Sequence, residues 1–315
     1  MTMSAGIRRL DTVGMRAATA ALVSAGTRIS LVPTMGALHE GHASLIRRSR
    51  ADGHATLVSV FVNPAQFGPT EDFGRYPRTH EADVELAASA GADMVWFPEV
   101  HDLYPSASVG VAGTPRLGVA GTMHVCAGPT GEVLCGASRP GFFDGVCTVV
   151  LKLFSLSRAH VAHFGEKDWQ QLVLIRQMAR EFHLGVVVRG EPIVREPDGL
   201  AMSSRNRYLQ PEQRSTALAL HRTIEFARAR FAAGERSAAR LEEALLGAWR
   251  AEESAAPRAL RLDYLSLREP DTLMPAEQLA PATRLVLAAY LGDVRLIDNA
   301  PLGGGSTSAS EGGGA

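Results

Sequence analysis

The apolar residues of this chain gather in short runs that alternate with amphipathic stretches. The runs occupy residues 28–34, 55–62, 92–98, 159–165 and 185–190. Several are apolar on both sides, which is typical of strands buried within a parallel sheet. The amphipathic stretches, which predict helices, lie near residues 42–52, 79–90, 144–157 and 168–182. Because strands and helices alternate, we expect an α/β fold with a Rossmann-like, doubly wound parallel sheet.

The pattern changes at two later points. Residues 106–140 are rich in glycine and valine, and we interpret them as an insertion of short strands and loops. After Leu209, two amphipathic helical stretches separated near Gly234 precede strand-like runs at residues 261–269 and 283–302. Helices followed by strands predict a smaller α+β domain after the first.

The length supports this division, because a chain of 315 residues is long for a single core. The last residues, "GGGSTSASEGGGA", have no apolar anchor and are expected to be disordered. We therefore expect a Rossmann-like domain at residues 1–190, a smaller α+β domain at 191–302 and a disordered tail at 303–315.

Composition narrows the class of protein. The chain is 46% hydrophobic and 21% charged with a net charge of −1, which gives no general attraction to nucleic acid or to an anionic membrane. Its cysteines, Cys126, Cys135 and Cys147, are odd in number and lack CxxC spacing, so we interpret them as reduced thiols. The N-terminus lacks the apolar core of a signal peptide, and no run is long enough to span a bilayer. We expect a cytoplasmic protein.

The sequence around the end of the first apolar run suggests an anion site. Neither a P-loop, nor a GxGxxG fingerprint after the first strand, nor an HExxH zinc pattern is present. Instead the run leads into His39-Glu40-Gly41-His42. If a helix begins near Glu40, both imidazoles lie at its N-terminal end, where N–H groups and the helix dipole attract anions. Gly41 removes a side chain that would keep a phosphate from the backbone. Taken alone, the tetrad fits a phosphoryl site and two unrelated polar residues equally well.

Two further segments have side chains that suit phosphates. "GLAMSSRNRYL" (199–209) contains two hydroxyls and the guanidinium of Arg205, which donates to phosphate oxygens in a fixed geometry. "FGEKDWQQLVLIRQM" (164–178) contains Lys167, with Asp168 placed to cap the following helix. Each alone also fits a solvated turn or a surface lysine. Together with the tetrad they are better explained by one ligand site, because ligands of open α/β sheets bind at the carboxyl ends of the strands.

At this point the sequence resembles known proteins. The HxGH tetrad and the later "MSSR" resemble the HIGH and KMSKS pair of the nucleotidylyltransferase and class I aminoacyl-tRNA synthetase superfamily. More narrowly, the chain resembles the pantothenate synthetase (pantoate–β-alanine ligase) family in "PTMGALHEGH", "FVNPAQFGPTEDFGRYPRT", "FGEKDWQQ" and "VREPDGLAMSSRNRYL". The resemblance runs from about Ile29 to Leu302 in one order, with no missing block.

The resemblance implies an ATP-dependent ligation in two steps. Pantoate would attack the α-phosphate of ATP to give pantoyl adenylate and pyrophosphate, and the amine of β-alanine would then displace AMP to give pantothenate, a coenzyme A precursor. It also implies a homodimer, a smaller domain that closes over the site, and no prosthetic group. Mg²⁺ should arrive with ATP, held mainly by phosphates and water.

The resemblance also assigns residues. It implies that His42 donates a proton and that Gln66 contacts both pantoate and β-alanine, whereas Gln171 contacts pantoate. It implies ATP contacts at Met35, Gly36, Ala37, Leu38, His39, Glu40, Gly41, His42, Gly165, Glu166, Lys167, Asp168, Val194, Met202, Ser203, Ser204 and Arg205.

Charge and polarity at these positions fit the implied chemistry. Attack at phosphorus places negative charge on the phosphate oxygens, and His39, His42, Lys167 and Arg205 can neutralise it. The neutral amides of Gln66 and Gln171 can orient a carboxylate nucleophile without withdrawing as much charge as an arginine would.

One residue departs clearly from the family pattern. Relatives commonly have "RPGHF" where this chain has "RPGFF", so Phe142 replaces a histidine and offers no hydrogen bond. Trp169 stands where tyrosine is frequent, a milder change.

Two alternative functions remain open from the sequence. A plain nucleotidylyltransferase would share the HxGH and MSSR segments, but the neutral "NPAQF" and "DWQQ" stretches better suit a small hydroxy acid. A degenerate protein that binds nucleotide without turnover is supported only by Phe142.

Overall fold

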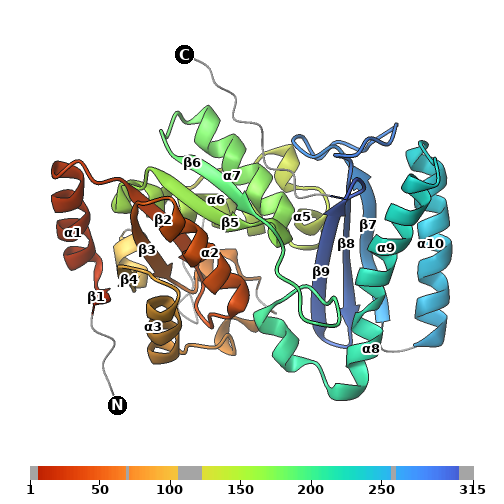
Figure 1. Cartoon of the computed structure of the whole chain (residues 1–315), viewed down its shortest axis with the longest axis horizontal. Coiled ribbons are helices and arrows are strands. Elements are labelled where there is room, and N and C mark those ends of the chain that lie inside the picture. Colours follow the sequence, from red (N-terminus) through yellow and green to blue (C-terminus); the bar gives the residue numbers. More distant parts are fainter. Residues whose placement is uncertain (1–5, 69–70, 106–122, 257–259, 305–315) are drawn as a thin grey trace. The chain divides into compact units, whose positions relative to one another are not determined.

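The computed structural model describes residues 6–68, 71–105, 123–256 and 260–304. The chain divides into two compact units (Figure 1). The first contains Met1–Gly165 and Gln170–Glu191, and the second contains Glu166–Trp169 and Pro192–Ala315. A segment of four residues that directly follows a strand of the first unit therefore belongs to the second.

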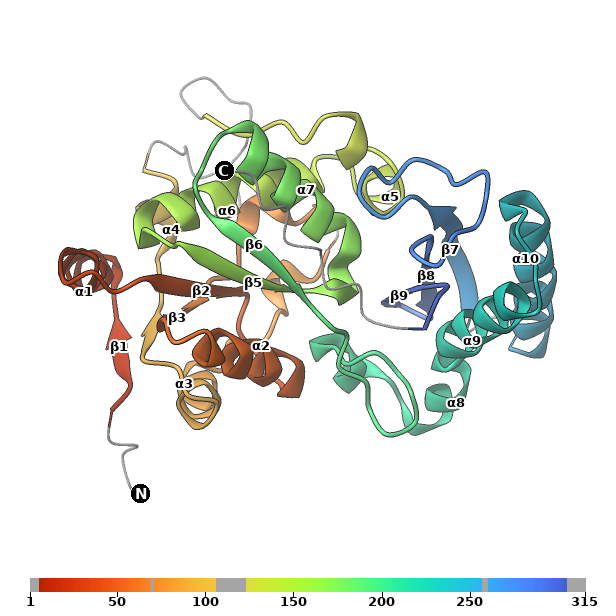
Figure 2. The same cartoon turned by 45° about the horizontal axis from the view of Figure 1, so that its top comes forward.

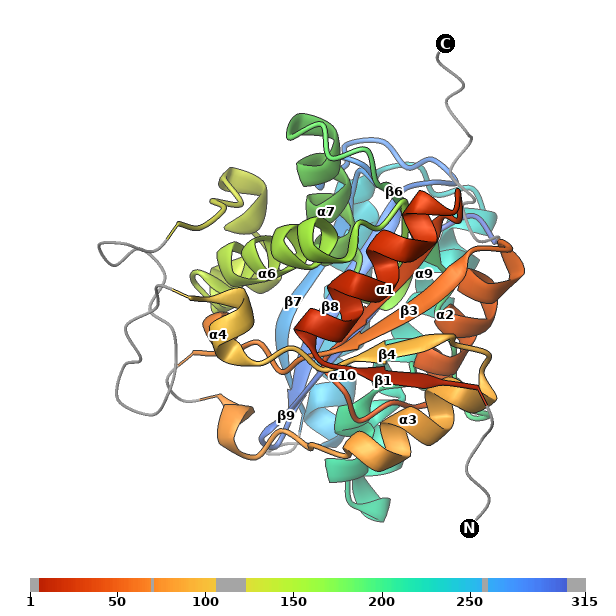
Figure 3. The same cartoon turned by 90° about the vertical axis from the view of Figure 1, so that its left-hand side faces the viewer.

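A six-stranded sheet forms the centre of the first unit, and all its neighbouring strands are parallel. Its order is β1 (Arg8–Leu10), β4 (Met94–Trp96), β3 (Ala55–Val60), β2 (Ile29–Thr34), β5 (Val161–Gly165) and β6 (Val187–Glu191). The edge strand β1 lies beside β4 (Figure 3). Five strands match the predicted apolar runs, and the Rossmann-like fold is confirmed. The three-residue β1 was not predicted, because it is too short and too polar to form an apolar run.

Helices cover both faces of this sheet, as a doubly wound fold requires. In Figure 2, α2 and α3 lie on one face and α6 and α7 on the other. The helices are α1 (Thr12–Ser24), α2 (Glu40–Ala51), α3 (His80–Ser89), α4 (Val100–Leu103), α5 (Cys135–Ser138), α6 (Phe142–Ser157) and α7 (Trp169–Glu181). The central strands are apolar because they are covered on both sides, and Leu31, Val32 and Val58 are fully buried.

The expected strands of residues 106–140 are not found in the part that the structure describes. Residues 123–140 contain the 3₁₀ turn η3 (Pro129–Gly131) and the short helix α5; residues 106–122 lie outside the described residues. Side chains hold this backbone in place of a strand partner. The Gln170 amide donates to the carbonyls of Thr130 and Val133 at 2.9 and 2.8 Å and accepts from the Cys135 N–H at 3.1 Å. For residues 123–140 the expected strands are absent, because valine content indicates a strand only where another strand is available to pair.

The second unit is a three-stranded antiparallel sheet covered by two helices, which confirms the predicted α+β arrangement. Its elements are α8 (Arg214–Ala217), α9 (Ala219–Ala232), α10 (Ala238–Ala255), β7 (Leu260–Arg268), β8 (Arg284–Leu291) and β9 (Val294–Pro301). The helices separate at Gly234, as predicted, where the backbone φ of +99° favours glycine. Trp249, Leu285 and Leu287 lie in its apolar core. Of the predicted tail, residues 305–315 lie outside the described residues.

Short 3₁₀ turns connect these elements. They are η1 (Pro64–Gln66), η2 (Asp72–Gly74), η4 (Glu166–Asp168), η5 (Ser204–Tyr208) and η6 (Pro211–Gln213). Among the described residues, none of the helices combines the length and the apolar character that crossing a bilayer requires.

Candidate active site

The sheet order of the first unit indicates where a ligand would bind. Strand β2 lies between β3, the next strand along the chain, and β5, which comes much later. This reversal makes the carboxyl ends of β2 and β5 a topological switch point, where open α/β sheets bind ligands. The HxGH tetrad follows β2, and Gly165 is the last residue of β5.

The two histidines form the N-terminal cap of α2. The Gly41 N–H donates to His39 Nδ1 at 3.1 Å, and the His39 N–H donates to His42 Nδ1 at 3.3 Å. Their ring centroids are 4.1 Å apart. A reciprocal cap of this kind satisfies two of the N–H groups that every helix start leaves without an intrahelical partner.

This cap fixes the protonation form that each imidazole adopts when neutral. A ring that accepts at Nδ1 carries its proton on Nε2, whereas a cationic ring would direct an Nδ1–H at a backbone N–H. In their neutral form, His39 and His42 are therefore Nε2–H donors at a helix start.

Gly41 is required for the same cap. A Cβ at this position would lie 2.9 Å from His39 Cε1 and 3.0 Å from His39 Nδ1. A side chain would therefore displace the imidazole, a reason for the glycine that is separate from access for a phosphate.

The buried carboxylate of Asp83 on α3 holds the loop before the tetrad. It accepts from the Leu38 N–H at 2.8 Å and the Ala37 N–H at 3.3 Å. Gly36 and Ala37 have φ angles of +81° and +50°, in the left-handed region that costs energy for a residue with a Cβ. Asp83 thus stabilises the strained part of residues 35–38, the loop that precedes the HxGH tetrad (the tetrad loop). Sequence reasoning missed it because it lies more than forty residues beyond the loop and belongs to no nucleotide motif.

Gln66, at the end of η1, is also buried and oriented. Its Oε1 accepts from Asn63 Nδ2 at 3.0 Å, and its Nε2 lies 3.0 Å from Met35 Sδ. Gln66 and Met35, which the sequence assigned to different substrates, are therefore neighbours in the first unit. Asn63 was also missed, although it lies within the quoted "FVNPAQF" stretch.

The two glutamines of "DWQQ" have different environments. Gln170 is buried, and both ends of its amide are bonded to the backbone near α5. The side-chain amide of Gln171 is partly exposed and makes no hydrogen bond to any described residue. Of the pair, Gln171 is the one whose amide is available to a substrate.

In the second unit, η4 is attached to β9 by buried polar groups. Asn299 donates to the carbonyls of Glu166 and Lys167 at 2.9 and 2.8 Å, and Arg284 donates to Glu166 Oε2 at 2.7 Å. The Arg284 guanidinium also stacks on the Trp169 ring, 3.3 Å from its centroid. These contacts fix the backbone from which the Lys167 side chain extends.

The segment that contains "MSSR" folds back on itself before reaching η5. Residues Arg195 and Ala201 form an antiparallel bridge, and the Met202 N–H donates to the Val194 carbonyl at 3.0 Å. Ser203 caps η5 by accepting from the Arg205 N–H at 3.3 Å. Arg214 donates to Asp198 nearby, and this hydrogen bond lowers the pKa of the Asp198 carboxyl.

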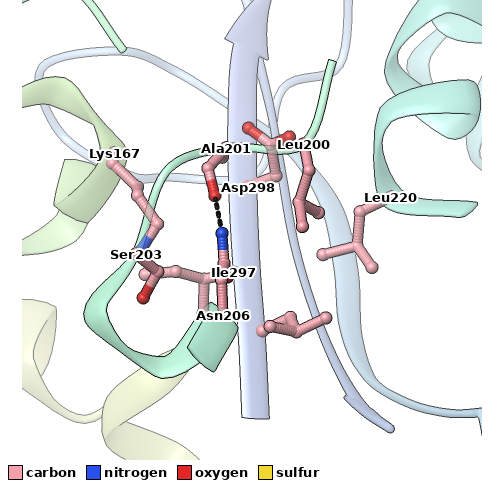
Figure 4. Close-up of a pocket in the computed structure, with 9 residues that line it drawn as sticks. Lys167, Leu200, Ala201, Ser203, Asn206, Leu220, Ile297 and Asp298 are labelled. Atoms are coloured by element: carbon pink, nitrogen blue, oxygen red, sulfur yellow. Dashed lines mark hydrogen bonds between the residues drawn. The ribbon is translucent and has the colours of Figure 1, made fainter. Parts of the chain in front are cut away.

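Lys167 and Ser203 line one small pocket of the second unit (Figure 4). Its other polar wall includes Asn206 and Asp298, and the Asn206 amide donates to the Ala201 carbonyl at 3.1 Å. The structure thus brings together two of the phosphate-suited residues that lie 36 positions apart in the sequence. In the part of the chain that the structure describes, no group of three or more His, Cys, Asp or Glu side chains is arranged to hold a metal ion.

Phe142 has a contact that a sequence comparison does not reveal. The Arg139 guanidinium lies 3.5 Å from the centroid of its ring, and the same guanidinium donates to both oxygens of Glu71 at 2.6 and 2.5 Å. The Phe143 ring packs edge-on against it at 4.8 Å. The Phe142 ring therefore stacks on the guanidinium of the Arg139–Glu71 ion pair in the first unit.

The comparisons of this chain with a family model, with curated proteins and with solved structures agree on one family. A family model described as pantoate-beta-alanine ligase matches residues 9–301. Proteins named pantothenate synthetase from Geobacter sulfurreducens and Saccharopolyspora erythraea are 46% and 50% identical over 278 and 283 residues, covering 88% and 90% of this chain and 92% and 86% of theirs. A pantothenate synthetase structure from Thermus thermophilus is 38% identical with a TM-score of 0.81, covering 94% of this chain and 99% of its own. A pantoate-beta-alanine ligase from Francisella tularensis, complexed with beta-gamma ATP and beta-alanine, is 28% identical with a TM-score of 0.71, covering 95% and 99%.

Proposed function

The chain belongs to the pantoate-beta-alanine ligase family and joins pantoate to β-alanine at the expense of ATP, and we propose the roles of its residues in that reaction. The observation that carries the proposal is the reciprocal histidine cap of α2. It presents two Nε2–H donors at a helix start, where an anion is also favoured by the helix dipole.

In the first step, a carboxylate oxygen of pantoate attacks the α-phosphorus of ATP and pyrophosphate leaves. Negative charge builds up on the phosphate oxygens, and donors that are already oriented stabilise it without reorganisation. His42 donates its Nε2 proton toward this charge, and His39 adds a second donor. Met35 to Leu38 line the nucleotide on the same loop, and Asp83 holds that loop in its strained conformation.

Lys167 and Arg205 bind the triphosphate with full positive charges, which the histidines lack in their neutral form. The hydroxyls of Ser203 and Ser204 and the backbone around Gly165, Val194 and Met202 complete the ATP contacts. This assignment is supported by the anchoring of η4 on β9 and by the pocket that Lys167 shares with Ser203. Mg²⁺ enters with ATP as part of the substrate, bound by phosphates and water.

Gln66 and Gln171 orient pantoate through neutral amides. The amine of β-alanine then attacks the carbonyl carbon of pantoyl adenylate, the C–N bond forms, the acyl–phosphate C–O bond breaks and AMP leaves. Gln66 contacts both acids, so it remains useful in the second step. Resemblance to the family further supports a cytoplasmic homodimer without a prosthetic group, and light scattering of the purified protein tests the dimer.

Pyrophosphate release measured in two stages tests the function. With ATP and pantoate alone, about one equivalent of pyrophosphate per site is expected, and β-alanine then starts steady turnover with AMP and pantothenate as products. A plain nucleotidylyltransferase would instead need a phosphate or nucleotide acceptor for turnover. A protein that binds ATP without turnover would release no pyrophosphate under either condition, which would contradict the proposal.

A further inference from the structure

A chain of buried hydrogen bonds leads from Gln66 to a residue that no motif contains. Gln66 Oε1 accepts from Asn63 Nδ2 at 3.0 Å, and Asn63 Oδ1 accepts from the hydroxyl of Tyr104 at 2.7 Å. Tyr104 follows α4, about forty residues after Gln66, and all three side chains are buried. Burial raises the pKa of the Tyr104 phenol, so the hydroxyl keeps its proton and donates.

The orientation of the Asn63 amide is fixed by partners that have only one role. The Ala65 N–H can only donate, and it points at Asn63 Oδ1 at 3.3 Å. The Gly145 carbonyl can only accept, and it receives Asn63 Nδ2 at 3.1 Å. The Asn63 amide therefore has its oxygen toward Tyr104 and its nitrogen toward Gln66.

The orientation of the Asn63 amide determines the orientation of the Gln66 amide. Because Asn63 presents a donor, Gln66 must turn its oxygen inward to accept, and its NH₂ then faces Met35 and the tetrad loop. An amide that faced the other way would offer an acceptor there. The side chain is thus set to donate, which suits the carboxylate and hydroxyl oxygens of pantoate and not an amine.

We propose that Tyr104 is a positioning residue for pantoate: its hydroxyl makes the shortest of the hydrogen bonds to the Asn63 amide and holds Asn63 in the place from which it orients the Gln66 amide as a hydrogen-bond donor to the hydroxy acid. This inference rests on the proposed contact between Gln66 and pantoate. Close backbone packing beside Asn63 also holds these side chains in place. A Cβ at Gly145 on α6 would lie 2.5 Å from the Ala65 carbonyl oxygen, so α6 and η1 approach each other over a glycine.

The Tyr104→Phe variant tests the proposal by removing one oxygen atom. The aromatic ring, its burial and its contact with the Lys152 ammonium at 5.1 Å would be retained. We expect the pantoate KM to rise roughly five- to tenfold, as for loss of one buried hydrogen bond, with the ATP KM and Tm close to wild type. Tyr290→Phe is a matched control in the second unit, because its ring also lies under a cation, Arg261, at 4.3 Å; it should change none of these values.

A double-variant cycle separates this inference from the function on which it rests. Gln66→Ala should raise the pantoate KM, and Tyr104→Phe should add nothing in that background, because the amide it orients is gone. If Gln66→Ala leaves the pantoate KM unchanged, the proposed role of Gln66 is wrong. If Gln66→Ala raises it but Tyr104→Phe does not, or if Tyr104→Phe lowers Tm and impairs all substrates equally, the positioning role of Tyr104 is wrong.

Discussion

Replacing Asp83 with asparagine should weaken adenylation selectively, although Asp83 does not belong to a nucleotide motif. The carboxylate accepts from the N–H groups of Ala37 and Leu38 and from the Thr79 hydroxyl at 3.2 Å. Asparagine has the same shape, but one of its two ends is a donor. Whichever way the amide turns, at least one backbone N–H of the loop then faces an NH₂ group.

The size of the effect follows from that mismatch. Loss of one hydrogen bond to a charged acceptor, with a buried donor left unsatisfied, costs about 1–3 kcal/mol. If all of this appeared in the adenylation transition state, the rate would fall about 5- to 150-fold. A part should appear as lower stability, at about 2–4 °C in Tm per kcal/mol for a domain of this size. Because Gly36 and Ala37 are in the left-handed region, the loop has a local reason to relax once the carboxylate is lost.

The assay compares the two half-reactions. Asp83→Asn should slow pyrophosphate release from ATP and pantoate, with a raised ATP KM, but should react more nearly normally when supplied with preformed pantoyl adenylate. Asp93→Asn is the matched control, because Asp93 also accepts a backbone N–H, that of Thr56 at 2.8 Å, but lies at the amino ends of the strands. Equal impairment of both half-reactions, or equal loss of adenylation in the two variants at the same loss of Tm, would refute this reasoning.

Four further substitutions address residues that the sequence singled out. His42→Ala should reduce the rate of pyrophosphate release by roughly two to four orders of magnitude, the range for one acid–base or oxyanion group, with less change in ATP affinity, and near-normal adenylation would refute its role. Lys167→Ala and Arg205→Ala should both fail at adenylation and improve with preformed pantoyl adenylate; equal failure in both half-reactions would indicate damage to folding. Phe142→His should leave an active enzyme and change the pantoate or ATP KM several-fold, and the reasoning fails if the wild-type protein binds ATP but releases pyrophosphate with pantoate only after this substitution.

The sequence predicted the parts of the fold that depend on local pattern. Buried parallel strands are apolar throughout, so their positions could be identified without knowing their partners. Residues 123–140 were misjudged because their conformation depends on Gln170, which lies beyond them in the chain and bonds their backbone. A segment held by a distant side chain has no periodicity of its own from which it can be predicted.

The residues of the candidate site likewise divide into those that a local pattern predicts and those that depend on distant parts of the chain. Contiguous motifs such as HxGH indicate which groups to propose as substrate contacts, because their spacing is set by one turn of local structure. The residues that hold those groups come from elsewhere, as Asp83 does for the tetrad loop and Asn63 for Gln66. Single polar residues within a helix or loop are common on any surface, so their sequence context does not distinguish a buried support from a solvated side chain.

The second unit anchors two segments that are far apart in the sequence: the one that contains Glu166 and Lys167, and the turn before "MSSR". Adjacent residues of β9 anchor both of them: Asp298 accepts from Arg195 at 2.7 and 2.9 Å, and Asn299 donates to the carbonyls of Glu166 and Lys167. Both anchors are almost completely buried, so neither can shift without leaving polar groups unsatisfied. The position of Lys167 relative to the turn before "MSSR" is therefore set by one strand. It follows that the four residues Glu166–Trp169 act with the second unit although they follow β5 directly, and that the placement of Lys167 depends on β9 as well as on its own motif.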